Sequence, residues 1–163
     1  MKRIGHKDDP GLGGTPPRAV HREALLYVED DDSNYRVAEL RLSVGYALSR
    51  AHDAFEACRT LREHGSSLSA ILMDIELRGS DLNGVELTKL IRGKPIERAL
   101  PSYAVGLPAL PNVPIIFVTA HGAKYPDAHL LFAGGDKVIP KPVDFAALNL
   151  ALTQLHLSRV KRR

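Results

Sequence analysis

The chain contains the stretch Ala24-Leu25-Leu26-Tyr27-Val28, which is followed at once by four acids, Glu29-Asp30-Asp31-Asp32. An apolar run of this length without a polar interruption is typical of a strand that is buried on both faces, as in a parallel sheet. The acids mark the point where the strand leaves the core. We therefore expect a buried strand over residues 24–28 with carboxylates at its carboxyl end.

The same pattern recurs along the chain, and helical patterns separate its occurrences. Further buried strands are expected over residues 69–75, 113–119 and 138–139, and a weaker strand over residues 46–50. Strands that alternate with helices favour an α/β fold. The sequence thus predicts a doubly wound, five-stranded parallel sheet with helices on both faces.

The predicted helices are marked by capping residues and apolar stripes. Asp53 is expected to cap a helix whose buried stripe consists of Ala54, Ala57, Cys58 and Leu61. Ser33 is expected to cap an earlier helix, with its stripe at Val37, Leu40 and Val44. Further helices are expected after Asn83-Gly84, around residues 127–133 and after Asp144.

Two stretches fall outside this alternation of strands and helices. Residues 1–22 contain four Gly and three Pro without periodicity, so we expect a disordered N-terminal tail. Five of the eleven prolines lie between positions 95 and 114, so residues 93–112 are expected to be an insertion rather than one helix. The predicted domain then spans residues 23–158, and residues 159–163 form a basic C-terminal tail.

Composition and charge exclude several classes of protein. The net charge of +3 divides into +3 for residues 1–22, −4 for residues 23–158 and +4 for residues 159–163, which is a weak pattern for a DNA-binding domain. A single cysteine, Cys58, excludes an internal disulfide and favours a reducing compartment. Neither a membrane-spanning apolar run nor a secretory signal is recognisable. We expect a cytoplasmic protein that binds neither DNA nor a membrane.

Polar residues follow four of the predicted strands: Glu29-Asp30, Asp74, Thr119 and Lys141. Ligands bind at the carboxyl ends of the strands in such sheets, so these side chains are expected to meet at one edge. Three neighbouring carboxylates require a cation, and Mg²⁺ suits oxygen ligands, with Mn²⁺ as an alternative. A carboxylate can also form an acyl phosphate, whose oxygens an amine and a hydroxyl would bind.

Four segments carry a resemblance to a known family. They are Leu26-Tyr27-Val28-Glu29-Asp30-Asp31, Ile71-Leu72-Met73-Asp74-Ile75, Ile116-Phe117-Val118-Thr119-Ala120 and Ile139-Pro140-Lys141-Pro142. Together they resemble the response-regulator receiver family of two-component systems, over about residues 23–157 with the insertion at 93–112. The resemblance implies the flavodoxin-like fold of CheY-like proteins.

The resemblance also implies roles for individual residues. Asp74 would be the phosphoacceptor and a metal ligand, with Glu29 and Asp30 as the acidic pair near the metal. The backbone carbonyl of Glu76 would complete the protein's ligands.

The strands that follow Asp74 would supply the contacts to the phosphoryl group. Thr119 and Lys141 would bind it, and the Lys141-Pro142 peptide bond would be cis. Val138 stands where many family members carry an aromatic switch residue. A valine there puts the common coupling between the threonine and a ring in question.

The resemblance implies a phosphorylated signalling module rather than an enzyme beyond its own phosphorylation and dephosphorylation. A sensor histidine kinase or a histidine phosphotransfer protein would supply the phosphoryl group. Few residues follow the last helix, so we expect a stand-alone form that acts on a downstream protein target, through a homodimer, or in a phosphorelay.

The alternative is a receiver-like interaction module that works without phosphorylation, which Val138 and the insertion keep open. The apolar residues of 93–112 must pack either on the domain or on a partner. We expect them to form a docking surface remote from the strand ends, because the segment is anchored at the opposite pole.

Other sites are less well supported. The pattern Asp30-x-Asp32-x-Asn34 resembles a calcium loop but lacks the Gly and Glu that such a loop needs at its sixth and twelfth positions. A phosphatase with an aspartate nucleophile would need a second Asp where this chain has Glu76. His121 and His129 belong to no cluster with zinc-ligand spacing.

Overall fold

The computed structural model describes residues 22–120 and 124–161, so most of the predicted N-terminal tail, and His121, lie outside the described residues. One parallel sheet has the strand order β2-β1-β3-β4-β5. Its strands are β1 (Glu23–Val28), β2 (Tyr46–Ala51), β3 (Ala70–Met73), β4 (Ile115–Thr119) and β5 (Lys137–Pro140). This order places β1, β3 and β4, which carry the acids and Thr119, next to one another. The predicted five-stranded α/β fold is confirmed.

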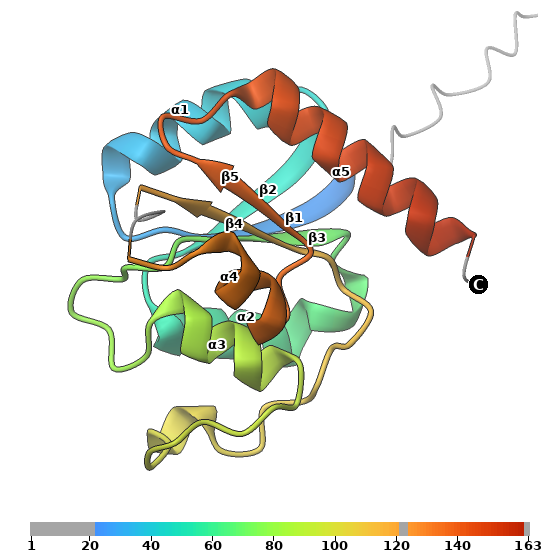
Figure 1. The fold of residues 1–163 in the computed structure, drawn as a ribbon. Helices are drawn as coiled ribbons and strands as arrows, with labels where there is room; N and C mark the ends of the chain where they lie inside the picture. The colour runs from blue at the N-terminus through green and yellow to red at the C-terminus, as the bar shows by residue number, and fades with distance from the viewer. Residues whose placement is uncertain (1–21, 121–123, 162–163) are drawn as a thin grey trace, which may run out of the picture.

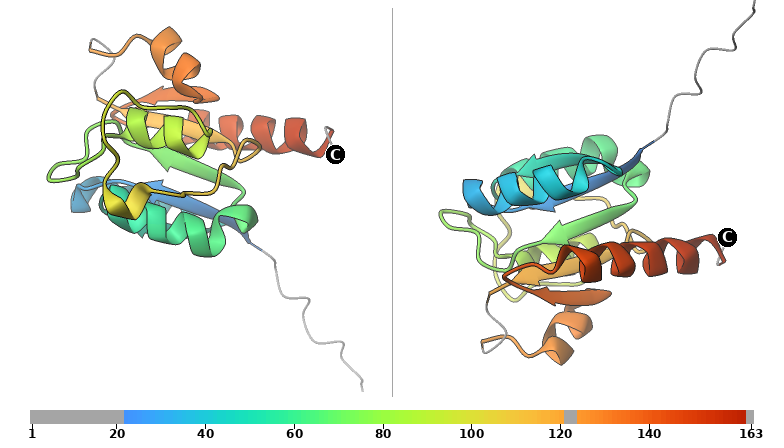
Figure 2. Two further views of the ribbon diagram at one scale, coloured as in Figure 1. Left: turned by 90° about the horizontal axis from the view of Figure 1, so that it is seen from below. Right: turned by 90° about the horizontal axis from the view of Figure 1, so that it is seen from above.

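Helices cover both faces of the sheet, as Figures 1 and 2 show. The helices α1 (Asp32–Leu42) and α5 (Phe145–Val160) lie on one face. The helices α2 (Ala54–His64), α3 (Gly84–Ile91) and α4 (Asp127–Ala133) lie on the other. Among the described residues, no helix is long and apolar enough to cross a membrane.

Each central strand contributes side chains to two cores. Along β1, Leu25 and Tyr27 join one buried cluster while Leu26 and Val28 join the other. Successive side chains of a strand point to opposite faces, so a strand covered on both sides must be apolar at every position. This is why the strands that end at the acids read as uninterrupted apolar runs.

The start of α1 corrects the predicted cap. Asp31, not Ser33, is the N-cap, and its Oδ1 accepts from the backbone N–H of Asn34 at 2.9 Å. The expected stripe is wrong as well, because Val37, Leu40 and Val44 are exposed. The buried residues of α1 are Ala38 and Leu42. The helix therefore presents its smaller apolar residues to the sheet.

The other capped helices agree with the sequence. Asp53 caps α2, whose buried residues are Ala54, Ala57, Cys58 and Leu61. Asp144 caps α5, which continues to Val160. Arg159, assigned to the basic tail, is thus part of the last helix, and its Nη1 donates to the carbonyl of Leu68 at 3.0 Å.

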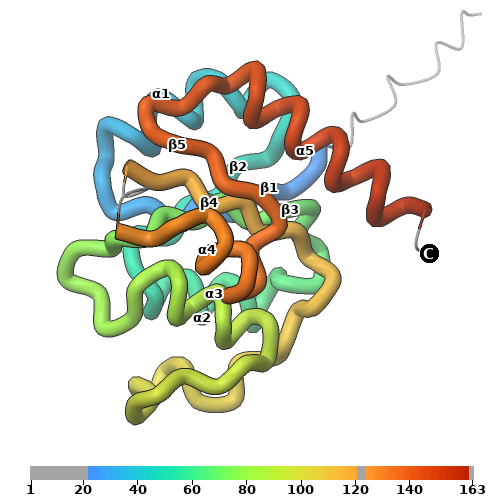
Figure 3. The backbone as a smooth tube through the Cα atoms, viewed as in Figure 1, coloured from blue at the N-terminus to red at the C-terminus, as the bar shows by residue number. Residues whose placement is uncertain are grey.

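The segment 93–112 packs on the outer side of α2 and α3, away from the sheet (Figure 3). Its short helix η2 (Ser102–Ala104) buries Ala104, and the ring of Tyr103 meets Phe55 of α2 edge-on, with centroids 5.5 Å apart. Near its far end, the N–H of Leu110 donates to the carbonyl of Ile91 at 2.7 Å. Of the two predicted alternatives, packing on the domain is what the structure shows.

Candidate functional site

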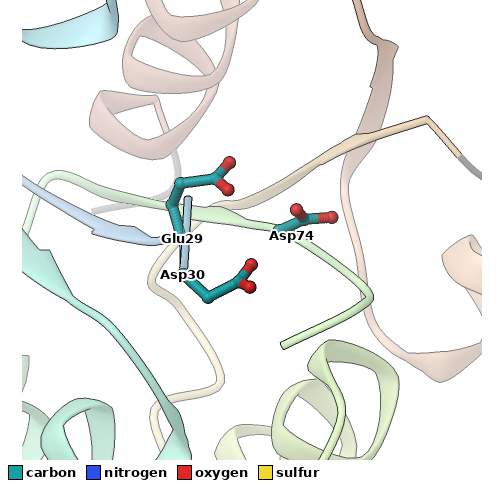
Figure 4. A group of neighbouring side chains, drawn as sticks. All are labelled: Glu29, Asp30 and Asp74. Atoms are coloured by element: carbon teal, nitrogen blue, oxygen red, sulfur yellow. The ribbon is translucent and has the colours of Figure 1, made fainter. Parts of the chain in front are cut away.

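The carboxyl ends of β1 and β3 bring three carboxylates together. Glu29 and Asp30 follow β1, and Asp74 follows β3. Each of the three offers an oxygen, and these atoms all lie within 4.8 Å of one another. Figure 4 shows the three side chains leaving the ends of the two neighbouring strands. The expected convergence of Glu29, Asp30 and Asp74 is therefore present.

Lys141 joins the group from the end of β5. Its Nζ donates to Asp74 Oδ2 at 2.6 Å and to Glu29 Oε2 at 2.7 Å. Burial alone would lower the pKa of Lys141, but the hydrogen bonds to Asp74 and Glu29 outweigh it and the pKa is raised. A protonated amine thus lies directly beside the Asp74 carboxyl group.

Glu29 is fully buried and saturated with donors. Its Oε2 accepts from the Tyr27 hydroxyl at 2.8 Å as well as from Lys141. Its Oε1 accepts from the N–H of Asp31 at 3.1 Å and from Asn34 Nδ2 at 3.3 Å. A buried charge needs such partners. Glu29 holds Lys141 in place from behind and has little capacity left for a direct metal bond.

Two hydrogen bonds that involve backbone groups fix the position of Asp74. Its N–H donates to the carbonyl of Val28 at 3.0 Å, and its Oδ1 accepts from the N–H of Ile75 at 2.7 Å. Burial raises the pKa of the Asp74 carboxyl group above its ordinary value, and Lys141 offsets this only in part.

The turn after Asp74 is closed by glycine. The N–H of Gly84, the first residue of α3, donates to the carbonyl of Ile75 at 2.8 Å. A Cβ at position 84 would lie only 1.9 Å from the Asp74 carbonyl oxygen. The start of α3 can therefore approach the strand end only because residue 84 has no side chain.

Two arginines that the sequence analysis did not single out fix the acidic loop after β1. Arg50, from β2, donates through Nε to the carbonyl of Glu29 and through Nη2 to that of Asp30, each at 2.9 Å. Arg78, from the β3–α3 loop, donates through Nε to Asp30 Oδ2 at 2.7 Å. Arg50 could have been found, because β2 ends beside β1 in a parallel sheet. Arg78 lies in a loop, where no periodicity places a side chain.

The remaining predicted residues lie around this centre. Thr119, the last residue of β4, is buried, and its carbonyl accepts from the N–H of Lys141 at 2.9 Å. The Lys141-Pro142 peptide bond is cis. Glu76 is half-buried, and its Oε1 lies 3.2 Å from Lys124 Nζ. Val138 on β5 is half-buried and packs against the cluster between the sheet and α2, α3 and α4.

The donor set fits a hard divalent cation. All three acids offer carboxylate oxygens, the ligands that Mg²⁺ prefers. The side chains of Asp30 and Asp74 are 13% and 9% exposed, whereas that of Glu29 is fully covered. Asp30 and Asp74 are therefore the two carboxylates that a cation entering from solvent can reach.

Comparisons with known proteins identify the family. A family model described as the response regulator receiver domain matches residues 25–153. The polar-differentiation response regulator DivK of Brucella anthropi is 29% identical over 122 residues, which cover 74% of this chain and 85% of DivK.

Several solved structures share the fold. The receiver domain of the sensor histidine kinase PA1611 from Pseudomonas aeruginosa, solved with a magnesium ion in its active site cleft, has a TM-score of 0.65 and 28% identity. The match covers 83% of this chain and 98% of that domain. NtrX from Brucella abortus has a TM-score of 0.70 and 22% identity over 87% of this chain, which corresponds to 29% of NtrX. This chain thus spans less than a third of NtrX.

Proposed function

The chain belongs to the response-regulator receiver family, and from this premise we propose that it accepts a phosphoryl group on Asp74 and signals through protein–protein contacts. The observation that carries the proposal is the 2.6 Å contact between Lys141 Nζ and Asp74 Oδ2. It places a cation where the oxygens of a phosphoryl group on Asp74 would need one. We propose a sensor histidine kinase or a histidine phosphotransfer protein as the donor.

In the proposed reaction, an Asp74 carboxylate oxygen attacks the phosphorus of a phosphohistidine. The new O–P bond forms while the P–N bond breaks, and the imidazole nitrogen keeps the electron pair and takes up a proton. Lys141 then turns from the carboxylates to the phosphoryl oxygens, and the Thr119 hydroxyl donates to one of them. Catalysis would extend no further than this transfer and its hydrolysis.

Asp30, Asp74 and the backbone carbonyl of Glu76 would hold Mg²⁺, or Mn²⁺ in its place, while Glu29 orients Lys141. When bound, the ion offsets the negative charge that gathers between the carboxylates and the incoming phosphoryl group. The contacts around Glu29 support this division, because four donors already engage its oxygens.

The phosphorylated module would act in the cytoplasm on a downstream protein, on a second copy of the chain, or in a relay. We propose that it binds neither DNA nor a membrane itself. A phosphorylation-independent interaction module is the second candidate, and the half-buried Val138, which has no ring to move, favours it.

The test is labelling by a small phosphoryl donor such as acetyl phosphate with Mg²⁺. Wild type should gain a phosphoryl group that is labile in both acid and base, as an acyl phosphate is, and Asp74→Asn should gain none. Asp81→Asn, which changes an exposed acid of the same loop, is the matched control and should label normally. Full labelling of Asp74→Asn would reject Asp74 as the acceptor, and an unlabelled wild type would favour the second candidate.

A further inference from the structure

The loop between β3 and α3 carries a cation into the acidic site. Arg78 Nε donates to Asp30 Oδ2 at 2.7 Å, and the backbone N–H of Arg78 lies 3.3 Å from the same oxygen. Its Nη2 donates to Asp31 Oδ2 at 3.3 Å. A single side chain thus bridges two successive acids, one of which belongs to the cluster of three carboxylates.

This position of Arg78 is set by the loop and not only by its flexible side chain. Leu77 and Leu82, on either side of the loop, are buried in the core. Between them, Ser80 Oγ accepts from the N–H of Ala54 at 3.1 Å and donates to the carbonyl of Leu82 at 2.8 Å. Because both flanks are anchored, the backbone at Arg78 stays beside Asp30.

Arg78 contacts an oxygen that a metal ion would need. Asp30 is one of the two carboxylates that solvent reaches, and Arg78 donates to its Oδ2 twice. A guanidinium cannot be deprotonated, so it repels a divalent ion at any pH the protein survives. The side chain of Arg78 is 76% exposed and can move into solvent with little loss of packing.

We propose that Arg78 is a tethered competitor for Asp30, which sets the affinity of the site for divalent metal and leaves Asp30 when the metal binds. The inference rests on the part of the proposed function that assigns a divalent metal to Asp30 and Asp74. The ligand whose affinity Arg78 controls is the divalent metal ion. Arg78 has a second acid, Asp31, on which it can remain after it releases Asp30.

The experiment is a Mg²⁺ titration by calorimetry at fixed ionic strength. Arg78→Ala should bind Mg²⁺ about three- to tenfold more tightly than wild type, as expected for removing one exposed unit charge beside the ion. Arg78→Gln should do the same, and Arg78→Lys should fall between. The difference should shrink as salt is raised, because exposed charges are screened.

Lys124→Ala is the matched control, since Lys124 is another exposed cation near the site but contacts Glu76 rather than Asp30. It should tighten Mg²⁺ binding less than Arg78→Ala does. An equal gain in Mg²⁺ affinity in both variants would show an effect of net charge alone. That result would overturn the proposal that Arg78 competes with the metal for Asp30. Unchanged or weaker affinity in Arg78→Ala would overturn it as well.

A direct readout is the NMR signal of the Arg78 Nε–H group. It should be protected from solvent exchange without metal and lose that protection as Mg²⁺ is added. Protection that persists at saturating Mg²⁺ would contradict the inference. If the affinities change as expected but acetyl phosphate labels neither protein, the phosphoryl-transfer proposal fails and the inference stands.

Discussion

At the scale of single residues, the site depends on an approach that only glycine permits. We predict that Gly84→Ala destabilises the fold by about 1–3 kcal/mol, the range for forcing extra atoms into a packed place. The added Cβ would meet the Asp74 backbone, so the strand end or α3 must shift. Urea unfolding measures the loss. Gly45→Ala is the control, because nothing lies within 4 Å of a Cβ at that position. Equal stabilities of the two variants would contradict the prediction.

Cys58 is a core residue, as its place on the apolar stripe predicts. Burial raises the pKa of its thiol from near 9.0 to about 11. Between pH 9 and about pH 11, Cys58 keeps its proton in the folded protein but loses it in the unfolded chain. The free energy of unfolding therefore falls as pH rises through this range. The loss should reach about 2–3 kcal/mol at pH 11.

Urea unfolding from pH 8 to pH 10.5 checks this, with Cys58→Ala as the reference for every other group that titrates in the range. The stability advantage of wild type over Cys58→Ala should narrow as pH rises. An advantage that stays constant would show that the thiol does not titrate between the two states.

At the scale of elements, the sequence predicted some helices better than others. The stripe of α2 was correct because Asp53 fixes where the helix begins and polar residues fill its other positions except for Phe55. In α1, apolar residues occur on two sides, and periodicity alone does not tell which side faces the sheet. In the structure, the side with Ala38 and Leu42 faces the sheet, and the small side chain of Ala38 lets the helix pack closely against it.

The helix α3 contains a buried hydroxyl that lacks a partner within the described structure, Thr88 Oγ1. A hydroxyl removed from water without a hydrogen bond costs stability. We predict that Thr88→Val, which keeps the shape, raises the free energy of unfolding by about 0.5–2 kcal/mol. Thermal and urea unfolding measure it, with Thr153→Val as the control, since Thr153 Oγ1 is exposed and donates to the carbonyl of Asn149. A loss of stability in Thr88→Val would mean that the hydroxyl is satisfied.

The middle of segment 93–112 contacts the β3–α3 loop, which the sequence did not predict. Arg98 donates to both oxygens of Glu86, at 2.7 and 3.0 Å, and to the carbonyl of Asp81 in the β3–α3 loop. Only the two ends of the segment, which follow α3 and precede β4, lie at the amino-terminal ends of the strands. Its middle returns along α3 to the end that carries the acids.

We predict that Arg98→Ala loosens the β3–α3 loop while costing at most about 1 kcal/mol of global stability, because both side chains of the pair are partly exposed to solvent. Hydrogen exchange at residues 77–82 should accelerate. Arg62→Ala, which breaks a bond to the Val105 carbonyl in the same segment, should leave these amides unchanged. Unaltered exchange in Arg98→Ala would mean that the loop does not depend on the segment.

At the scale of the molecule, the acids, the amine and the hydroxyl meet because the strands are parallel and end at one edge. Topology made this part of the site predictable: Asp74, Glu29, Asp30 and Lys141 follow strands. The contacts of Arg78 were not predictable, because a loop has no period from which to place a side chain. The saturation of Glu29 was hidden for another reason. Tyr27, Asp31 and Asn34 lie within five residues of Glu29, but only the folded turn from β1 into α1 directs them, together with the distant Lys141, at its oxygens.

Concentrated negative charge also predicts a metal-dependent stability. An ion that binds only the folded protein stabilises it by about 1.4 kcal/mol when its free concentration is ten times the Kd. We predict that the thermal midpoint rises with Mg²⁺ and not with Na⁺ at matched ionic strength. Asp30→Ala should lose most of this rise. An equal rise with either salt would show that screening, not binding, is responsible.

The helix α5 runs antiparallel to the strands, and this has a practical consequence for handling the protein. β1 begins at Glu23, at the amino-terminal ends of the strands, and α5 ends at Val160 on that same side of the molecule, as Figure 1 shows. A fusion partner joined directly at Glu23 or at Val160 would therefore begin on the side away from Asp74. A protein held on a sensor surface at Glu23 or Val160 would present the carboxyl ends of its strands outward, open to soluble kinases, metals and small phosphoryl donors.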